Sequence, residues 1–206
     1  MKGSSSTTPT SVTVVGVVSH SGSEVTASDK FPALNLAAND FALFQLPQQF
    51  AIDLLTLEQS WKTLQRHAHP DMHAHADAAA QRLSMQWSVR INEAYQRLKN
   101  PIKRAAYLCE LKGEPIAAET NTAMPTDFLV QQINWRETLD AADSPGEIDV
   151  LLTEVKTYRN TLLAECAHYL DDVSNIQMAA MSVRALMFVD RFIQAVMLQL
   201  DRLESA

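Results

Sequence analysis

From Asp40 onward, apolar residues recur with the spacing of an α-helix, and this pattern limits the possible folds more than any other feature. Leu57, Trp61 and Leu64 follow one another at i, i+4 and i+7, which places them on one helix face. A longer stripe of the same kind contains Leu83, Trp87, Ile91, Ala94 and Leu98. Because no stretch of residues 39–206 alternates with period two for long enough to form a sheet, the sequence predicts an all-α fold.

The first two stripes are predicted to be antiparallel helices that share a core. The segment HAHPDMHAHADA lies between them. Pro70 cannot continue the first helix, and it biases His69 away from helical geometry. Asn100 and Pro101 end the second helix, and a further helix is expected before Gly113. The sequence therefore predicts a helical hairpin with an enforced break at its turn.

A second group of helices follows residues 114–123, which have the composition of a linker. One helix is predicted over about residues 126–142. The next should begin at SPGE, where Ser144 can cap the helix, Pro145 suits its first position and Glu147 completes a capping box. Two more apolar stripes contain Ile148, Leu151, Leu152, Val155, Tyr158, Leu162 and Cys166, and then Ile176, Ala180, Val183, Met187, Ile193, Met197 and Leu200. Three antiparallel helices would bury these stripes together.

The tripeptide His69-Pro70-Asp71 in the hairpin turn has the properties of a binding site. Pro70 fixes its own φ and restricts His69, so Asp71 loses little entropy on binding. Its carboxylate suits a bidentate arginine on a partner. Lys62 and Arg66, four residues apart, would share a helix face and meet an acidic surface. An ordinary solvated face is the alternative for these two cations.

These residues resemble a J domain, in which His-Pro-Asp follows a basic helix end. The downstream segment NEAYQRLKNPIKRAAY is similar to the Asn-Glu-Ala-Tyr and Pro-x-x-Arg-x-x-Tyr pattern of that family. The resemblance implies that His69, Pro70, Asp71, Lys62 and Arg66 contact the ATPase module of a DnaK-class chaperone, whose ATP hydrolysis the contact accelerates. A tripeptide alone would be a weak signal, since His-Pro is a common helix terminator.

The segment FLVQQINWRETLD predicts a helix that is apolar on two sides. Phe128, Trp135 and Leu139 can fill the bundle core, while Leu129 and Ile133 lie with Val130 on another face. A three-helix module has little room to bury both sides, so the second face is expected to bind a partner. Packing against the rest of the protein is the alternative.

A J domain joined to an acidic three-helix bundle resembles the HscB-type co-chaperones of iron-sulfur cluster assembly, over about residues 39–206. The resemblance implies that Leu129, Val130, Ile133, Glu137 and Phe188 bind the iron-sulfur scaffold IscU, which is delivered to the chaperone HscA. Two usually acidic positions of that surface are Asn134 and Ala141. We therefore expect hydrophobic docking to dominate. A J-domain co-chaperone with a different client protein is the alternative.

Charge is distributed unevenly along the chain. Residues 39–113 hold 9 Lys+Arg against 7 Asp+Glu, whereas residues 114–206 hold 6 against 15. Such asymmetry suggests two modules with different partners. With a net charge of -7, the chain is a poor candidate for nucleic-acid binding. The sequence thus predicts a tail at 1–38, a J domain at 39–113, a linker at 114–123 and a scaffold-binding bundle at 124–206.

Other function classes find little support. His67, His69, His73 and His75 have spacings that permit a metal site, but Pro70 separates the pairs and no cysteine is near, so solvated histidines are favoured. We expect no cofactor and no enzymatic chemistry, because Gly-rich phosphate loops and His-Glu-x-x-His runs are missing.

The remaining features concern the compartment. Cys109 and Cys166 are too few and too far apart in the chain for a thiolate site or a disulfide framework, which favours a reducing environment. The stretch Val12–Val18 is too short to cross a membrane. Residues 1–38 have no paired cysteines and do not form an Arg-rich presequence, unlike many mitochondrial members of the family, so we expect a bacterial cytoplasmic protein without membrane partners.

Overall fold

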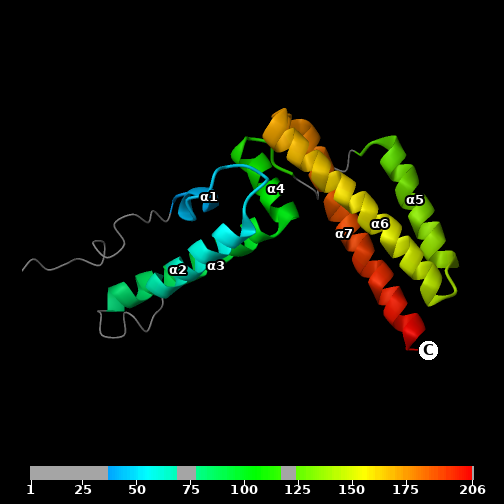
Figure 1. Cartoon of the computed structure of the whole chain (residues 1–206), viewed down its shortest axis with the longest axis horizontal. Coiled ribbons are helices and arrows are strands. Elements are labelled where there is room, and N and C mark those ends of the chain that lie inside the picture. Colours follow the sequence, from blue (N-terminus) through cyan, green and yellow to red (C-terminus); the bar gives the residue numbers. More distant parts are fainter. Residues whose placement is uncertain (1–36, 69–77, 117–123, 206) are drawn as a thin grey trace, which may run out of the picture. The chain divides into compact units, whose positions relative to one another are not determined.

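The computed structural model describes residues 37–68, 78–116 and 124–205. Every regular element in these ranges is a helix (Figure 1), which confirms the predicted all-α fold. The described residues also fall within one compact unit. In chain order the elements are α1 (Asp40–Leu43), α2 (Leu54–Ala68), α3 (Ala78–Lys99), α4 (Pro101–Leu111), α5 (Thr126–Ala141), α6 (Pro145–Ala167), the π-helix η3 (His168–Asp172) and α7 (Ile176–Glu204).

Helices α2 and α3 form the predicted hairpin. The rings of Trp61 and Tyr95 stack with 4.6 Å between their centroids, and Nε1 of Trp61 donates to Oδ1 of Asn92 at 3.0 Å. At the other end, Oγ of Ser84 donates to the carbonyl of Ala68 at 2.6 Å. Polar contacts therefore fix the pairing of the two helices at both ends, with the predicted apolar stripes between them.

Short polar signals set the ends of α4. The Asn100 side chain accepts from the amides of Ile102 and Lys103, and Pro101 occupies the first helical position. After Leu111 the chain leaves the helix through Gly113, whose φ is +86°. This value lies in the left-handed region that glycine adopts at low cost. The predicted stop at Gly113 is thus confirmed.

Helices α5, α6 and α7 form the predicted three-helix bundle (Figure 1). Its clearest sequence signal is confirmed, since the Ser144 side chain and the Glu147 carboxylate make the reciprocal hydrogen bonds of a capping box. Hydrogen bonds from the amides of Asp143 and Ser144, among others, lower the pKa of Glu147. One expectation is wrong: Met197 is 43% exposed, because the buried stripe of α7 runs from Ile193 through Val196 to Leu200 and leaves Met197 at its outer side.

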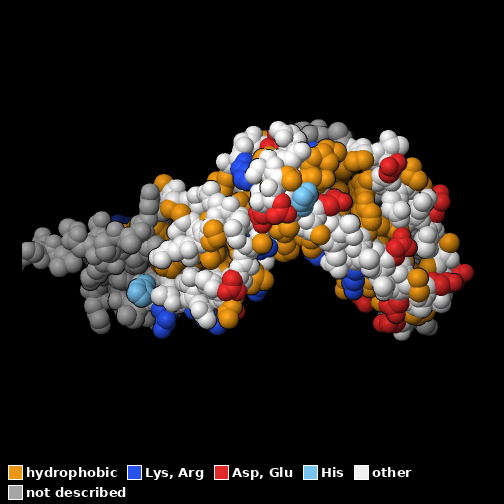
Figure 2. All heavy atoms as spheres, turned by 45° about the horizontal axis from the view of Figure 1, so that its top comes forward, with side chains coloured by type: hydrophobic (Ala, Val, Ile, Leu, Met, Phe, Trp, Pro, Cys, Tyr) orange, Lys and Arg blue, Asp and Glu red, His pale blue; other side chains and the backbone are white. Residues whose placement is uncertain are grey.

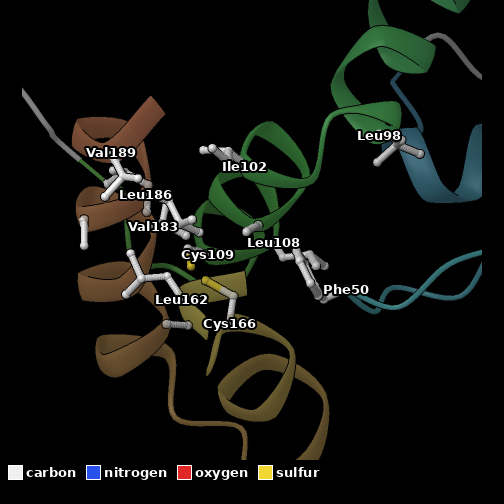
Figure 3. Close-up of a cluster of buried hydrophobic side chains, with 14 of the residues drawn as sticks. Phe50, Leu98, Ile102, Leu108, Cys109, Leu162, Cys166, Val183, Leu186 and Val189 are labelled. Carbon is white, nitrogen blue, oxygen red and sulfur yellow. The ribbon is translucent and has the colours of Figure 1, made fainter. Parts of the chain in front are cut away.

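Buried apolar side chains of α4 pack against the bundle. Figure 3 shows Ile102, Leu108 and Cys109 of α4 facing Val183, Leu186 and Val189 of α7, with Leu162 and Cys166 of α6 beside them. The two cysteines are free and fully buried, and their thiols lie close together in this view.

Candidate functional site

The basic face of α2 is open to solvent. Lys62 has 61% of its side chain exposed, and its Nζ lies 2.6 Å from Oε1 of Glu58, one turn earlier. Arg66 is exposed, and its Nη2 lies 3.5 Å from Oγ1 of Thr63. The hydrogen bond between Lys62 and Glu58 raises the pKa of the lysine and lowers that of the glutamate. Both cations are held by their own helix rather than by the core, so a partner can reach them.

Asp53 fixes the start of this helix, a role that the sequence reading missed. Its carboxylate accepts from the amides of Leu55 at 3.0 Å and Thr56 at 3.2 Å, and also from the Thr56 hydroxyl. The Thr56 hydroxyl is the largest cause of the lowered pKa of Asp53. The pattern Asp-Leu-Leu-Thr is a helix-start signal that could have been recognised from the sequence.

The predicted tripeptide His69-Pro70-Asp71 lies outside the described residues, as do His73 and His75. The flanking helices are described. Helix α2 ends at Ala68, directly before the tripeptide, and α3 resumes at Ala78. The chaperone-binding role of these three residues therefore stays a prediction from the sequence.

Helix α5 has one face in the bundle core. Phe128 and Trp135 are almost fully buried. The Trp135 ring stacks on Phe192 of α7 with 5.8 Å between centroids, and its Nε1 donates to Oε1 of Glu154 on α6 at 2.8 Å. These contacts set the rotation of α5 about its axis, and so determine which residues point outward.

The outward face of α5 is apolar at the three predicted positions. Leu129, Val130 and Ile133 are 44%, 50% and 55% exposed. We call these residues the α5 stripe. Glu137 lies one turn further along and is also exposed. The prediction that this helix is apolar on two sides, with one side at the surface, is confirmed, and packing of the stripe against the rest of the described chain is excluded.

Phe188 differs from the stripe, because its ring takes part in the packing of the bundle. It meets Phe128 edge-on at 5.8 Å and stacks with Phe192 at 6.4 Å, and the Arg136 guanidinium lies 5.9 Å above it. A shallow groove of about 320 Å³ opens beside the ring, lined by Arg136, Leu139, Asp140, Arg191, Phe192 and Ala195 as well. Since Ile133 and Arg136 are three residues apart on α5, this groove adjoins the stripe.

The bundle carries acidic side chains on its surface. Figure 2 shows Asp and Glu side chains gathered over the bundle on the face that it presents. Across the described ranges no group of three or more His, Cys, Asp or Glu side chains could hold a metal ion. Among the described helices none is long and apolar enough to cross a membrane.

Comparison with known proteins gives a consistent result. A family model described as the HSCB C-terminal oligomerisation domain matches residues 124–197. The co-chaperone protein HscB homolog of Burkholderia thailandensis is 45% identical over 174 residues, which cover 83% of this chain and 99% of the relative. The homolog of Paraburkholderia phymatum is 42% identical with the same coverage.

Two solved structures are similar as well. Chaperone HscB from Vibrio cholerae matches with a TM-score of 0.70 and 32% identity, over 81% of this chain and 99% of that chain. The human co-chaperone protein HscB matches with a TM-score of 0.76 over 81% of this chain and 84% of that chain, and at 22% identity this likeness concerns the fold alone.

Proposed function

The chain belongs to the HscB family of co-chaperones, and from this premise we propose that it couples an iron-sulfur scaffold protein to a DnaK-class ATPase. The bundle binds the scaffold IscU, and the J domain docks on the chaperone HscA and stimulates its ATP hydrolysis. The result is transfer of the iron-sulfur cluster from scaffold to recipient. The chain itself acts by binding and carries out no chemical step.

The α5 stripe is the observation that carries the scaffold-binding half of the proposal. Three neighbouring aliphatic side chains are about half exposed on a helix whose opposite face is core. Complete burial of one large aliphatic side chain contributes about 1.5–3 kcal/mol, and roughly half of that is still available from each of these half-exposed side chains when a partner covers them. Phe188 contributes the edge of its ring through the adjoining groove, and Glu137 adds a charge at the margin.

The chaperone-binding half rests on the sequence of the hairpin turn and on the exposed face of α2. Asp71 would pair with an arginine of the chaperone, and the rigid His69-Pro70 unit would present it. Lys62 and Arg66 lie on the helix that leads into this turn and would meet acidic side chains.

A cytoplasmic location fits this proposal. Both cysteines are free thiols, which suits a reducing compartment, and the proposed partners act together with the ATP pool of the cell interior.

A steady-state ATPase assay with purified HscA and IscU tests the whole proposal. The native chain should stimulate hydrolysis, and IscU should increase the stimulation. Asp71→Ala should abolish the stimulation while IscU binding, measured by calorimetry, stays unchanged. Asp77→Ala, which changes an aspartate of the same segment, is the matched control and should behave as the native chain. Undiminished stimulation by Asp71→Ala would contradict the J-domain role.

A further inference from the structure

The carboxylate of Asp171 accepts hydrogen bonds from the backbone segment that leads into α2. Oδ1 of Asp171, in η3, accepts from the amide of Phe50 at 2.7 Å, and its Oδ2 accepts from the amide of Ala51 at 2.8 Å. The two oxygens thus accept hydrogen bonds from consecutive amides that lie 121 and 120 positions earlier in the chain. A carboxylate that receives two directed hydrogen bonds fixes the direction of its partner as well as its distance.

Neighbouring contacts hold the same junction. The Phe50 ring is buried, with the Arg104 guanidinium of α4 lying 4.9 Å from its centroid. Asp171 also acts electrostatically on Arg104, whose pKa burial lowers. On the other side, Nζ of Lys112 donates to the carbonyl of Leu170 at 3.2 Å. The π-helix therefore contacts the hairpin region both before α2 and after α4.

The segment that Asp171 binds, Phe50 and Ala51, lies shortly before the start of α2. Two residues after Ala51, Asp53 caps the helix that carries Lys62 and Arg66. The apolar contact between α4 and α7 (Figure 3) holds the hairpin against the bundle, but dispersion and the hydrophobic effect are weakly directional. The two hydrogen bonds of Asp171 add the directional restraint. Because Asp171 is exposed, their loss would leave the fold intact.

We propose that Asp171 is a positioning residue that fixes the orientation of the chaperone-binding hairpin relative to the scaffold-binding bundle, and thereby couples scaffold binding to ATPase stimulation. This inference rests on the proposed function. A scaffold protein held on the α5 stripe reaches the chaperone in a productive position only when the bundle and α2 keep a fixed relation. Asp171 touches neither partner, and acts through Phe50, Ala51 and the start of α2.

Three variants separate positioning from a general loss of stability. Asp171→Ala removes both hydrogen bonds, and Asp171→Asn keeps one acceptor oxygen. Asp172→Ala removes the adjacent carboxylate, whose Oδ2 lies 3.1 Å from Nδ1 of His168 in the same turn. In the ATPase assay, Asp171→Ala should retain the stimulation seen without IscU and the native affinity for IscU. The additional stimulation by IscU should fall about fivefold or more, with Asp171→Asn intermediate and Asp172→Ala native. A native response of Asp171→Ala to IscU would overturn the inference.

A distance measurement tests the positioning without either partner. Spin labels on Gln59→Cys of α2 and Lys156→Cys of α6 report the separation of hairpin and bundle, since both positions are exposed. The native cysteines are buried, and burial raises their pKa, so they should resist labelling. The distance distribution should be narrow in the native chain and in Asp172→Ala, and broad in Asp171→Ala. Equal widths in all three would overturn the inference. If the native chain gave no stimulation of HscA, the proposed function would be refuted. A broader distance distribution in Asp171→Ala would still support the positioning role of Asp171 in that case.

Discussion

Arg97 on α3 donates a hydrogen bond to the buried carboxylate of Asp40 on α1, with 2.9 Å between Nη1 and Oδ2. The other carboxylate oxygen lies 2.7 Å from Nη2 of Arg90. The amide of Asp40 in turn donates to the hydroxyl of Tyr107 at 3.1 Å. Asp40 is completely buried, whereas both arginines keep part of their side chains in solvent. A polar network, rather than helix propensity, therefore holds this four-residue helix in place.

Removal of the buried partner should destabilise the protein. Asp40→Ala is expected to lower the free energy of unfolding by about 3 kcal/mol, at the lower end of the range for breaking a buried pair, because the two arginines can regain water. Urea unfolding followed by circular dichroism measures the change. Asp149→Ala, at an exposed position, is the control and should stay within about 0.5 kcal/mol of the native chain. Equal unfolding midpoints for the two variants would contradict the role assigned to Asp40.

Truncation of the α5 stripe should weaken scaffold binding without affecting the fold. The double variant Leu129→Ala, Ile133→Ala is expected to lose at least about 2 kcal/mol of binding free energy, or roughly 30-fold in Kd for IscU. Titration calorimetry measures the affinity, and the helical signal in circular dichroism should not change. Val150→Ala is the matched control, because Val150 is 71% exposed and lies outside the stripe. Retained affinity in the double variant would place the scaffold elsewhere.

Apolar periodicity and helix-end signals were sufficient to predict the local structure. The stripe from Leu83 to Leu98 predicted α3, and Ser144 with Glu147 predicted the start of α6. Both signals are local, because they depend on residues within a few turns of one another. The exposed face of α5 was predictable for the same reason, once its opposite face was assigned to the core.

Contacts between distant segments could not be read in this way. Asp40 and Asp171 are charged residues whose roles depend on partners far along the chain. Their sequence neighbours give no sign of burial or pairing, so both were missed. Met197 was misassigned for a different reason: the sequence offers apolar residues at both 196 and 197, and Val196 is the one that is buried.

Charge reversal on α2 should reduce chaperone stimulation. The double variant Lys62→Glu, Arg66→Glu is expected to weaken the stimulation of HscA about tenfold at low salt, because like charges would then face the acidic partner surface. The loss should diminish as salt rises and screens both interactions. Lys156→Glu, an exposed lysine of the bundle, serves as the control in the same ATPase assay. Unchanged stimulation by the double variant would indicate an ordinary solvated face.

The buried thiols should make the fold sensitive to alkali. Burial raises the pKa of Cys109 to about 11 and that of Cys166 to about 12, from the ordinary thiol value of 9.0. The folded state therefore keeps both protons at pH 10, whereas the unfolded chain releases most of them. Since the unfolded state binds fewer protons in this range, stability is retained below pH 9 and falls as the pH rises toward 11 and 12.

The expected loss between pH 8 and pH 10 is about 1.4 kcal/mol for each thiol. Urea unfolding at the two pH values measures the total change, to which tyrosines and lysines also contribute. The double variant Cys109→Ala, Cys166→Ala isolates the thiols, because its other titrating groups are the same. Its stability should fall by about 2–3 kcal/mol less than that of the native chain over this interval. An equal decline in the two proteins would show that the thiols ionise as readily in the fold as in the unfolded chain.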